Sequence, residues 1–208
     1  MTEQMQSLRD DIAYMKTLAV AGRQGQILGG SILLLTGVIF GTTSFISWAI
    51  QLKYLPALPG GIGLEWGVAV VLHLLALLVL IPAVQRRARA VGAGDNSRLF
   101  GAVWSSMGLA NFVAAAACVA AFARMQDFKM FLGYVPMIMV LYAMGWNISA
   151  AISRQRWMRL VALGSALAAV LLGWTIATNA MYLVFGASTF LFMALPGLKL
   201  VQRPAAQA

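Results

Sequence analysis

The side chains that could do chemistry inside this largely apolar chain are His73, Asn111 and Tyr142. Each lies roughly 10–12 residues from one end of its own hydrophobic segment, which at 1.5 Å per residue puts all three ~15–18 Å deep, near the middle of a bilayer. An ionisable residue at that depth is a candidate functional group. The three side chains therefore predict one of two things: a polar midplane site for a proton or solute, or hydrogen bonds that hold helices together.

The groups that would indicate an enzyme are missing from the sequence. His73 is the only histidine, which excludes a metal or haem site built on several histidines. The hydrophobic segments contain no aspartate and one glutamate, Glu65, which we expect at the outer mouth of the second segment, close to water. Paired carboxylates and Ser/His/Asp arrangements need more polar residues at one depth. We expect no catalytic residues, no metal and no cofactor.

Six hydrophobic segments would position these residues. The chain has 208 residues, of which 61% are hydrophobic and 10% charged, whereas soluble domains carry roughly 25% charged residues. Each segment has roughly 18–25 residues of continuous hydrophobicity, enough for a helix to cross a ~30 Å hydrocarbon core. The predicted fold is an all-α integral membrane protein with six transmembrane helices, at Ile27–Gln51, Leu64–Val84, Leu99–Ala123, Met130–Ile152, Met158–Ala177 and Ala180–Leu200.

The basic residues predict the orientation. The chain has 15 Lys and Arg residues, and all except Lys53, Arg124 and Lys129 fall on one side of the six segments. Cytoplasmic loops carry the excess of positive charge, so we expect both termini in the cytoplasm and a multi-pass protein of the bacterial inner (plasma) membrane. This distribution accounts for the net charge of +9 without a nucleic-acid partner. Anionic lipid is the expected contact of Arg86, Arg87, Arg89, Arg154, Arg156 and Arg159.

The N-terminal segment is the largest predicted element outside the membrane. We divide the chain into a cytoplasmic amphipathic helix (residues 1–26), a six-helix transmembrane domain (27–201) and a short cytoplasmic tail (202–208). Met5, Leu8, Ile12 and Met15 recur at spacings of three and four, so they share one face of a helix. Three occupants of this face stay open: the lipid surface, the protein's own loops or a second copy in a dimer, and a separate cytosolic protein.

Small residues indicate where helices approach closely. Gly37 and Gly41 form a GxxxG pair in the first segment, a pattern used both within chains and between chains, and the sequence does not separate these uses. In the third segment a face of small and polar residues also predicts close packing, through Gly101, Ser105, Gly108, Asn111, Ala115 and Cys118.

Two functions are compatible with these features. The first is a non-enzymatic regulatory or partner-binding protein, anchored in the membrane and acting through its cytoplasmic face, with the N-terminal apolar stripe as docking surface. The second is a small channel or transporter for an ion, proton or small solute, lined by His73, Asn111 and Tyr142. We favour the first, because almost all polar residues lie on the cytoplasmic side, the outer loops are short and no carboxylate is expected at the midplane.

Overall fold

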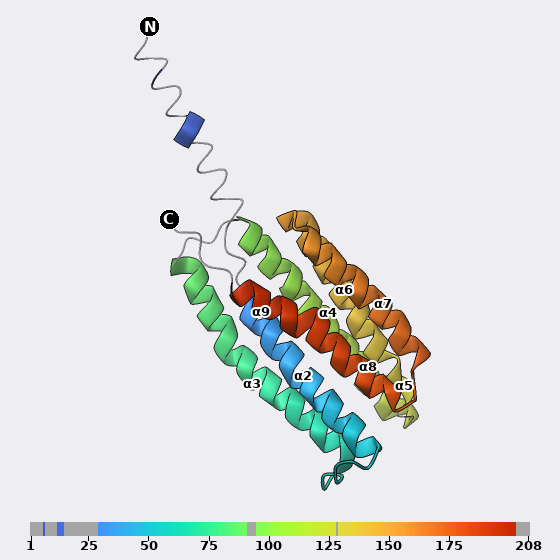
Figure 1. The fold of residues 1–208 in the computed structure, drawn as a ribbon. Helices are drawn as coiled ribbons and strands as arrows, with labels where there is room; N and C mark the ends of the chain where they lie inside the picture. The colour runs from blue at the N-terminus through green and yellow to red at the C-terminus, as the bar shows by residue number, and fades with distance from the viewer. Residues whose placement is uncertain (1–5, 7–11, 15–28, 91–94, 128, 203–208) are drawn as a thin grey trace.

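In the computed structural model the chain forms a bundle of long helices that alternate in direction (Figure 1). The structure describes residues 6, 12–14, 29–90, 95–127 and 129–202. Within these residues six helices are long and apolar enough to cross a membrane, which confirms the predicted multi-pass all-α class. The spans are α2 (Gly30–Gln51), α3 (Gly61–Ala90), α4 (Asp95–Met125), α6 (Tyr134–Ser153), α7 (Arg156–Trp174) and a last span made of α8 (Ala180–Thr189), η1 (Phe190–Ala194) and α9 (Leu195–Val201), with the single turn α5 (Lys129–Leu132) before α6.

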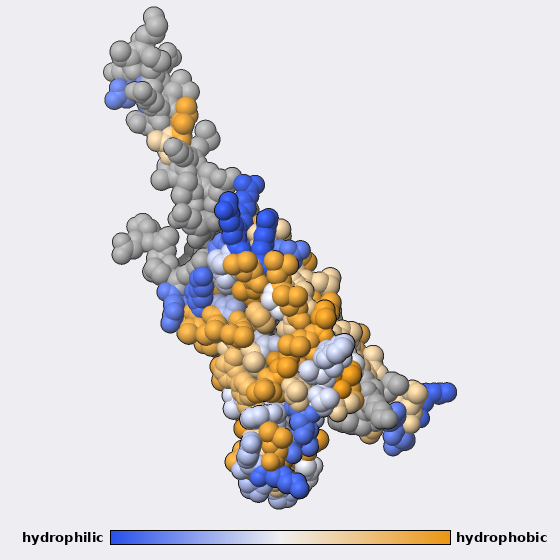
Figure 2. Space-filling view, turned by 45° about the vertical axis from the view of Figure 1, so that its right-hand side comes forward, coloured by the Kyte–Doolittle hydropathy of each residue, from blue (hydrophilic) through white to orange (hydrophobic). Residues whose placement is uncertain are grey.

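The two ends of the bundle differ in charge. Figure 2 shows hydrophobic side chains in a belt between two ends at which hydrophilic side chains gather. One end, which we call the basic end, collects the end of α3, the starts of α4 and α7 and the end of α9 (Figure 1). The other, which we call the loop end, carries the segment 52–60 between α2 and α3. Exposed arginines mark the basic end, at positions Arg86, Arg87, Arg89, Arg98, Arg154, Arg156 and Arg159.

The centre of the bundle is the contact between α2 and the last span. A Cβ on Gly37 would lie 2.4 Å from the backbone nitrogen of Ala194, and one on Gly197 would lie 2.4 Å from that of Leu34. No real side chain tolerates such distances, so only glycine permits these two backbones to meet. In this structure, therefore, the Gly37 and Gly41 pair serves packing within one chain.

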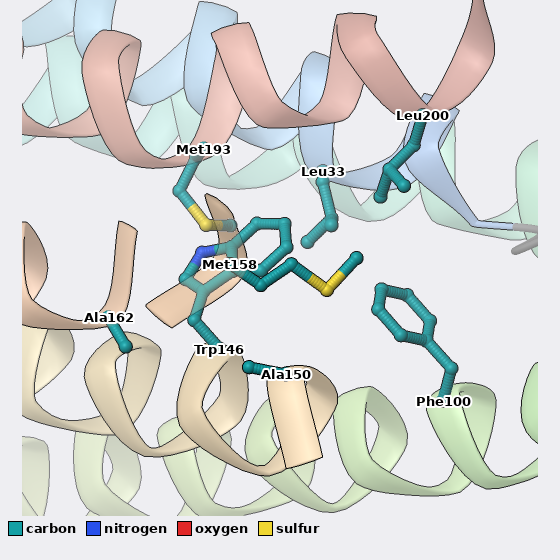
Figure 3. Close-up of a cluster of buried hydrophobic side chains, with 8 residues drawn as sticks. All are labelled: Leu33, Phe100, Trp146, Ala150, Met158, Ala162, Met193 and Leu200. Carbon is teal, nitrogen blue, oxygen red and sulfur yellow. The ribbon is translucent and has the colours of Figure 1, made fainter. Parts of the chain in front are cut away.

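A second region of close packing lies in the half of the bundle near the basic end, where α6 and α7 are neighbours. Trp146 of α6 and Met158 of α7 are both fully buried there (Figure 3). Phe100 is the residue through which α4 reaches this cluster, and it is 2% exposed. The cluster therefore joins five of the six spans, all except α3, through Leu33, Phe100, Trp146, Ala150, Met158, Ala162, Met193 and Leu200.

Two long helices lie at the periphery. α3 has 30 residues and packs against α2, while α4 has 31 residues and packs against α6. At 1.5 Å per residue each is ~45 Å long, more than a ~30 Å hydrocarbon core requires. Both bury little: Leu78 of α3 is 72% exposed and Leu109 of α4 is 65% exposed. The first part of the small-residue face of α4 is also uncovered, since Cβ atoms on Gly101 and Gly108 would meet open space, whereas Asn111 further along the face is partly buried.

A five-residue π-helical turn, η1, interrupts the last span just before Pro196. Proline has no backbone N–H, so the carbonyl of Phe192, four residues earlier, loses its helical partner. The indole Nε1–H of Trp146 donates to this carbonyl over 2.8 Å. A tryptophan on α6 thus satisfies the acceptor that the proline frees and ties α6 to the last span.

The predicted fourth segment needs correction. The segment expected at Met130–Ile152 is divided, because α5 ends at Leu132 and α6 begins at Tyr134. Pro136 then lies in the first turn of α6, where no N–H partner is required. At the N-terminus, residues 12–14 are helical and Ile12 is 57% exposed. Met5, Leu8 and Met15 of the predicted stripe lie outside the described residues.

Candidate functional site

The three predicted midplane residues lie at two different helix interfaces. His73 of α3 faces α2, where its ring centroid is 5.1 Å from that of Phe40. Asn111 of α4 faces α6, and its backbone carbonyl accepts a hydrogen bond from the Tyr134 hydroxyl over 3.4 Å. Tyr142 belongs to this second interface, with its ring centroid 6.2 Å from that of Trp104. The structure thus brings Asn111 and Tyr142 to one interface and His73 to another.

Two of these side chains carry unsatisfied polar atoms. His73 Nδ1 and Asn111 Oδ1 are buried and have no hydrogen-bond partner within the described residues. A buried polar atom without a partner costs about 1–3 kcal/mol. Each atom therefore marks a point at which a bound water or solute would be stabilised.

A residue that the sequence reasoning missed lies at the same interface as His73. Glu65 is 7% exposed, so its expected position close to water is wrong. Its Oε2 accepts a hydrogen bond from the Ser47 hydroxyl over 2.8 Å, and Ser47 Oγ accepts one from Trp66 Nε1 over 3.1 Å. Glu65 is near the loop end of α3, but it faces α2 instead of the loop, and Ser47 and Trp66 cover it.

One face of α3 carries two ionisable residues, Glu65 and His73. Glu65, Ala69 and His73 follow one another at intervals of four, so they line the same side of the helix, and Ala69 is 2% exposed against α2. The ring of Phe40 lies between the two ends of this line, with its centroid 6.3 Å from that of Trp66. We call this group the α2–α3 polar site; it consists of Phe40, Ser47, Glu65, Trp66 and His73.

The α2–α3 polar site has a defined chemical capacity. A carboxyl group and an imidazole both exchange protons, and a carboxylate also attracts cations. Burying such ionisable side chains in a membrane domain costs free energy, and those that occur there are candidates for functional residues. Within the described residues no Lys, Arg or His lies within ion-pair distance of Glu65, and no three His, Cys, Asp or Glu side chains are grouped to hold a metal. The four-residue spacing of Glu65, Ala69 and His73 was the signal available in the sequence.

The basic end is a second candidate surface, suited to contact rather than chemistry. Arg86, Arg87 and Arg89 are exposed on the last two turns of α3. Lys199 of α9 lies over the ring of Trp157, with Nζ 4.4 Å from the centroid. The basic residues are thus carried by helices, which fix the positions of their backbones.

Comparison with known proteins assigns the chain to no family. No family model matches it, and neither a curated protein nor a solved structure is similar to it.

Proposed function

We propose that this chain is a membrane-anchored partner-binding protein with a regulatory role, acting through its basic end. The observation that carries the proposal is the set of exposed arginines on helix ends. Arg86, Arg87 and Arg89 lie on α3, a helix of 30 residues. This helix is longer than the ~20 residues that are needed to span the hydrocarbon core. Side chains beyond that length stand in the aqueous phase, where a partner protein reaches them.

The cytoplasm of a bacterium is the compartment we assign to this end. Lys and Arg are concentrated in cytoplasmic segments of membrane proteins, and among the described residues only Lys53, Arg124 and Lys129 lie toward the loop end. Both termini are then cytoplasmic, and the N-terminal stripe of Met5, Leu8, Ile12 and Met15 lies on the same side as the arginines. The exposure of Ile12 supports its use in docking a second copy of the chain or a cytosolic protein.

Affinity purification from native membranes in mild detergent tests this proposal. The intact chain is compared with a variant carrying Leu8→Asp and Ile12→Asp and with a variant carrying Arg86→Gln, Arg87→Gln and Arg89→Gln. A control variant, Lys53→Gln with Arg124→Gln, removes charge from the loop end. We expect the first two variants to lose the partner or the dimer and the control to keep it. Identical companions and identical oligomeric size in all four samples would refute the proposal.

Transport of a proton or cation is a second candidate, favoured by the buried carboxylate of Glu65. The predicted lining of His73, Asn111 and Tyr142 is divided between two interfaces, whereas Glu65 and His73 share one face of α3. A transport function would therefore use the α2–α3 polar site, entered from the loop end near Glu65.

Liposomes containing the purified chain test the second candidate. We expect Glu65→Gln and His73→Ala to reduce proton or cation flux at least about tenfold, because each variant lacks a group that exchanges protons. Asn111→Ala, at the other interface, is expected to leave flux within a factor of about two, since it changes one packing contact. If flux and its pH dependence are the same in all three variants, the α2–α3 polar site has no transport role.

A further inference from the structure

An apolar groove opens between α2 and α3 in the basic half of the bundle. Its volume is about 570 Å³, within the range of roughly 300–1,000 Å³ typical of ligand sites. Val79 on its rim is 69% exposed, so the groove is open at the side that faces lipid. The lining is aliphatic except for one hydroxyl, and consists of Ser31, Leu34, Leu35, Val38, Ala76, Val79 and Leu80.

The groove exists because α3 stays close to α2 over only part of its length. Toward the loop end, α3 lies close to α2 and buries Glu65 and Ala69. The last span, in contrast, follows α2 to the basic end, where a Cβ on Gly30 would lie 2.8 Å from the carbonyl oxygen of Gly197. α3 diverges from α2 at this end (Figure 1), and the small side chain of Ala76 leaves the space between them unfilled.

A basic residue lies beyond the groove on α3, toward the basic end. Arg87 follows Leu80 by seven residues, which places it about 20° from Leu80 around the helix axis and ~10 Å further along it. Arg89 follows Leu80 by nine residues and is about 180° away, on the opposite side of α3. Both are exposed, and of these two Arg87 is the one aligned with Leu80. Ser31, in the first turn of α2, adds a hydroxyl near the same end.

We propose that this groove binds an anionic phospholipid. One acyl chain lies between α2 and α3 against Leu34, Val38 and Ala76, and the phosphate is held at Arg87. The location selects this occupant, because the groove is apolar and opens toward the hydrocarbon, and because Arg87 follows it on the same side of α3. A guanidinium forms charge-assisted hydrogen bonds with phosphate. The site would tie the loosely attached basic half of α3 to α2.

Native mass spectrometry of the purified full-length chain tests the acyl-chain part of the proposal. The chain is mixed with phosphatidylglycerol, which is anionic, or phosphatidylcholine, which is zwitterionic, and bound lipid is counted. Ala76→Trp fills the groove, whereas Leu78→Trp adds the same bulk at a neighbouring depth on a surface that is 72% exposed. We expect one phosphatidylglycerol retained by the wild type and by Leu78→Trp, and none by Ala76→Trp. Equal retention by both tryptophan variants would overturn the proposal.

A matched pair of arginine variants tests the headgroup part. Arg87→Gln is expected to reduce the preference for phosphatidylglycerol over phosphatidylcholine about fivefold, the loss expected for one basic residue near an anionic surface. Arg89→Gln removes the same charge from the opposite side and is expected to keep the preference. If both variants lose the preference equally, general attraction to the basic end explains the binding and the groove site is refuted.

A measurement on the unmodified chain covers the case in which Ala76→Trp fails to fold. Phosphatidylglycerol with a photoreactive group on its acyl chain is crosslinked to the wild type, and the modified peptides are mapped. Adducts concentrated at the residues that line the groove support the proposal: Ser31, Leu34, Leu35, Val38, Ala76, Val79 and Leu80. Adducts spread evenly over the exposed face of α3, including Leu75 and Leu78, show unselective contact with lipid and contradict it.

Discussion

Ser47 has a double role at the α2–α3 interface. Its hydroxyl donates to Glu65 and its oxygen accepts from Trp66, so one small side chain on α2 holds two side chains of α3. Both partners sit on consecutive positions of the same helix turn. The two hydrogen bonds of Ser47 therefore help to attach the loop-end half of α3 to α2.

Replacement of Ser47 by alanine is expected to lower the free energy of unfolding by about 1–3 kcal/mol, because it leaves a buried carboxyl oxygen and an indole N–H without partners. Thr43→Ala is the matched control on the same helix, since its hydroxyl bonds to the carbonyl of Ile39 within α2 and holds no second helix. Unfolding in mixed micelles with increasing denaturing detergent measures both. A loss in Thr43→Ala as large as that in Ser47→Ala would contradict this role.

The sequence predicts a depth for each candidate residue, but it does not predict which helices are its neighbours. Counting residues along each segment places His73, Asn111 and Tyr142 at similar depths, but sequence distance says nothing about which helices touch. The structure attaches α3 to α2 and α4 to α6, so His73 faces Phe40 and Asn111 faces Tyr134. Glu65 was misjudged for the same reason: its position near a helix end is visible in the sequence, while the direction it faces depends on α2.

At the scale of elements, the contact between α2 and the last span depends on glycine. Gly37→Ala is expected to lower the stability of the bundle by at least about 1–3 kcal/mol, as overpacking does, because the new Cβ would meet backbone atoms of Ala194. Gly108→Ala makes the same change on α4, where the Cβ would meet open space, and is expected to have little effect. Thermal unfolding of both variants in the same detergent measures the difference in stability. Equal losses of stability would show that the close contact between α2 and the last span is not the cause.

The six spans could be predicted from the sequence because the length of a hydrophobic segment is a local property of the chain. Six were expected, and six are found in the described part of the chain. The ends of α3 and α4 were underestimated, since both helices continue through polar and basic residues such as Arg86 and Arg89 that hydropathy assigns to loops. The sequence does not predict the π turn at η1 either, because the acceptor that Pro196 frees, the carbonyl of Phe192, is satisfied by Trp146, which lies 46 positions away in the sequence.

For the whole molecule, the segregation of charge predicts how the bundle lies in the membrane. A reporter that is active only in the cytoplasm is expected to be silent when fused after Gly60, in the loop-end segment, and active when fused after Gly94, between α3 and α4. The reason is the excess of arginine at the basic end. A complementary reporter that is active only outside the cytoplasm serves as control, and the opposite pattern from both reporters would reverse the assigned orientation.

The π turn also has a consequence for the length of the last span. Hydrogen bonds that reach one residue further than in an α-helix make room for one extra residue in a turn, and here Leu195 N–H donates to the carbonyl of Phe190. Deletion of Leu191, which is 52% exposed, would convert the turn to regular helix and leave the flanking glycine contacts with α2 aligned. Deletion of Leu183 in α8 would instead rotate the part of the helix before this position by about 100° relative to the part after it. We therefore expect the protein to fold when Leu191 is deleted from η1 and to fail to fold when Leu183 is deleted from α8. The yield of folded protein from the two deletion variants measures this difference.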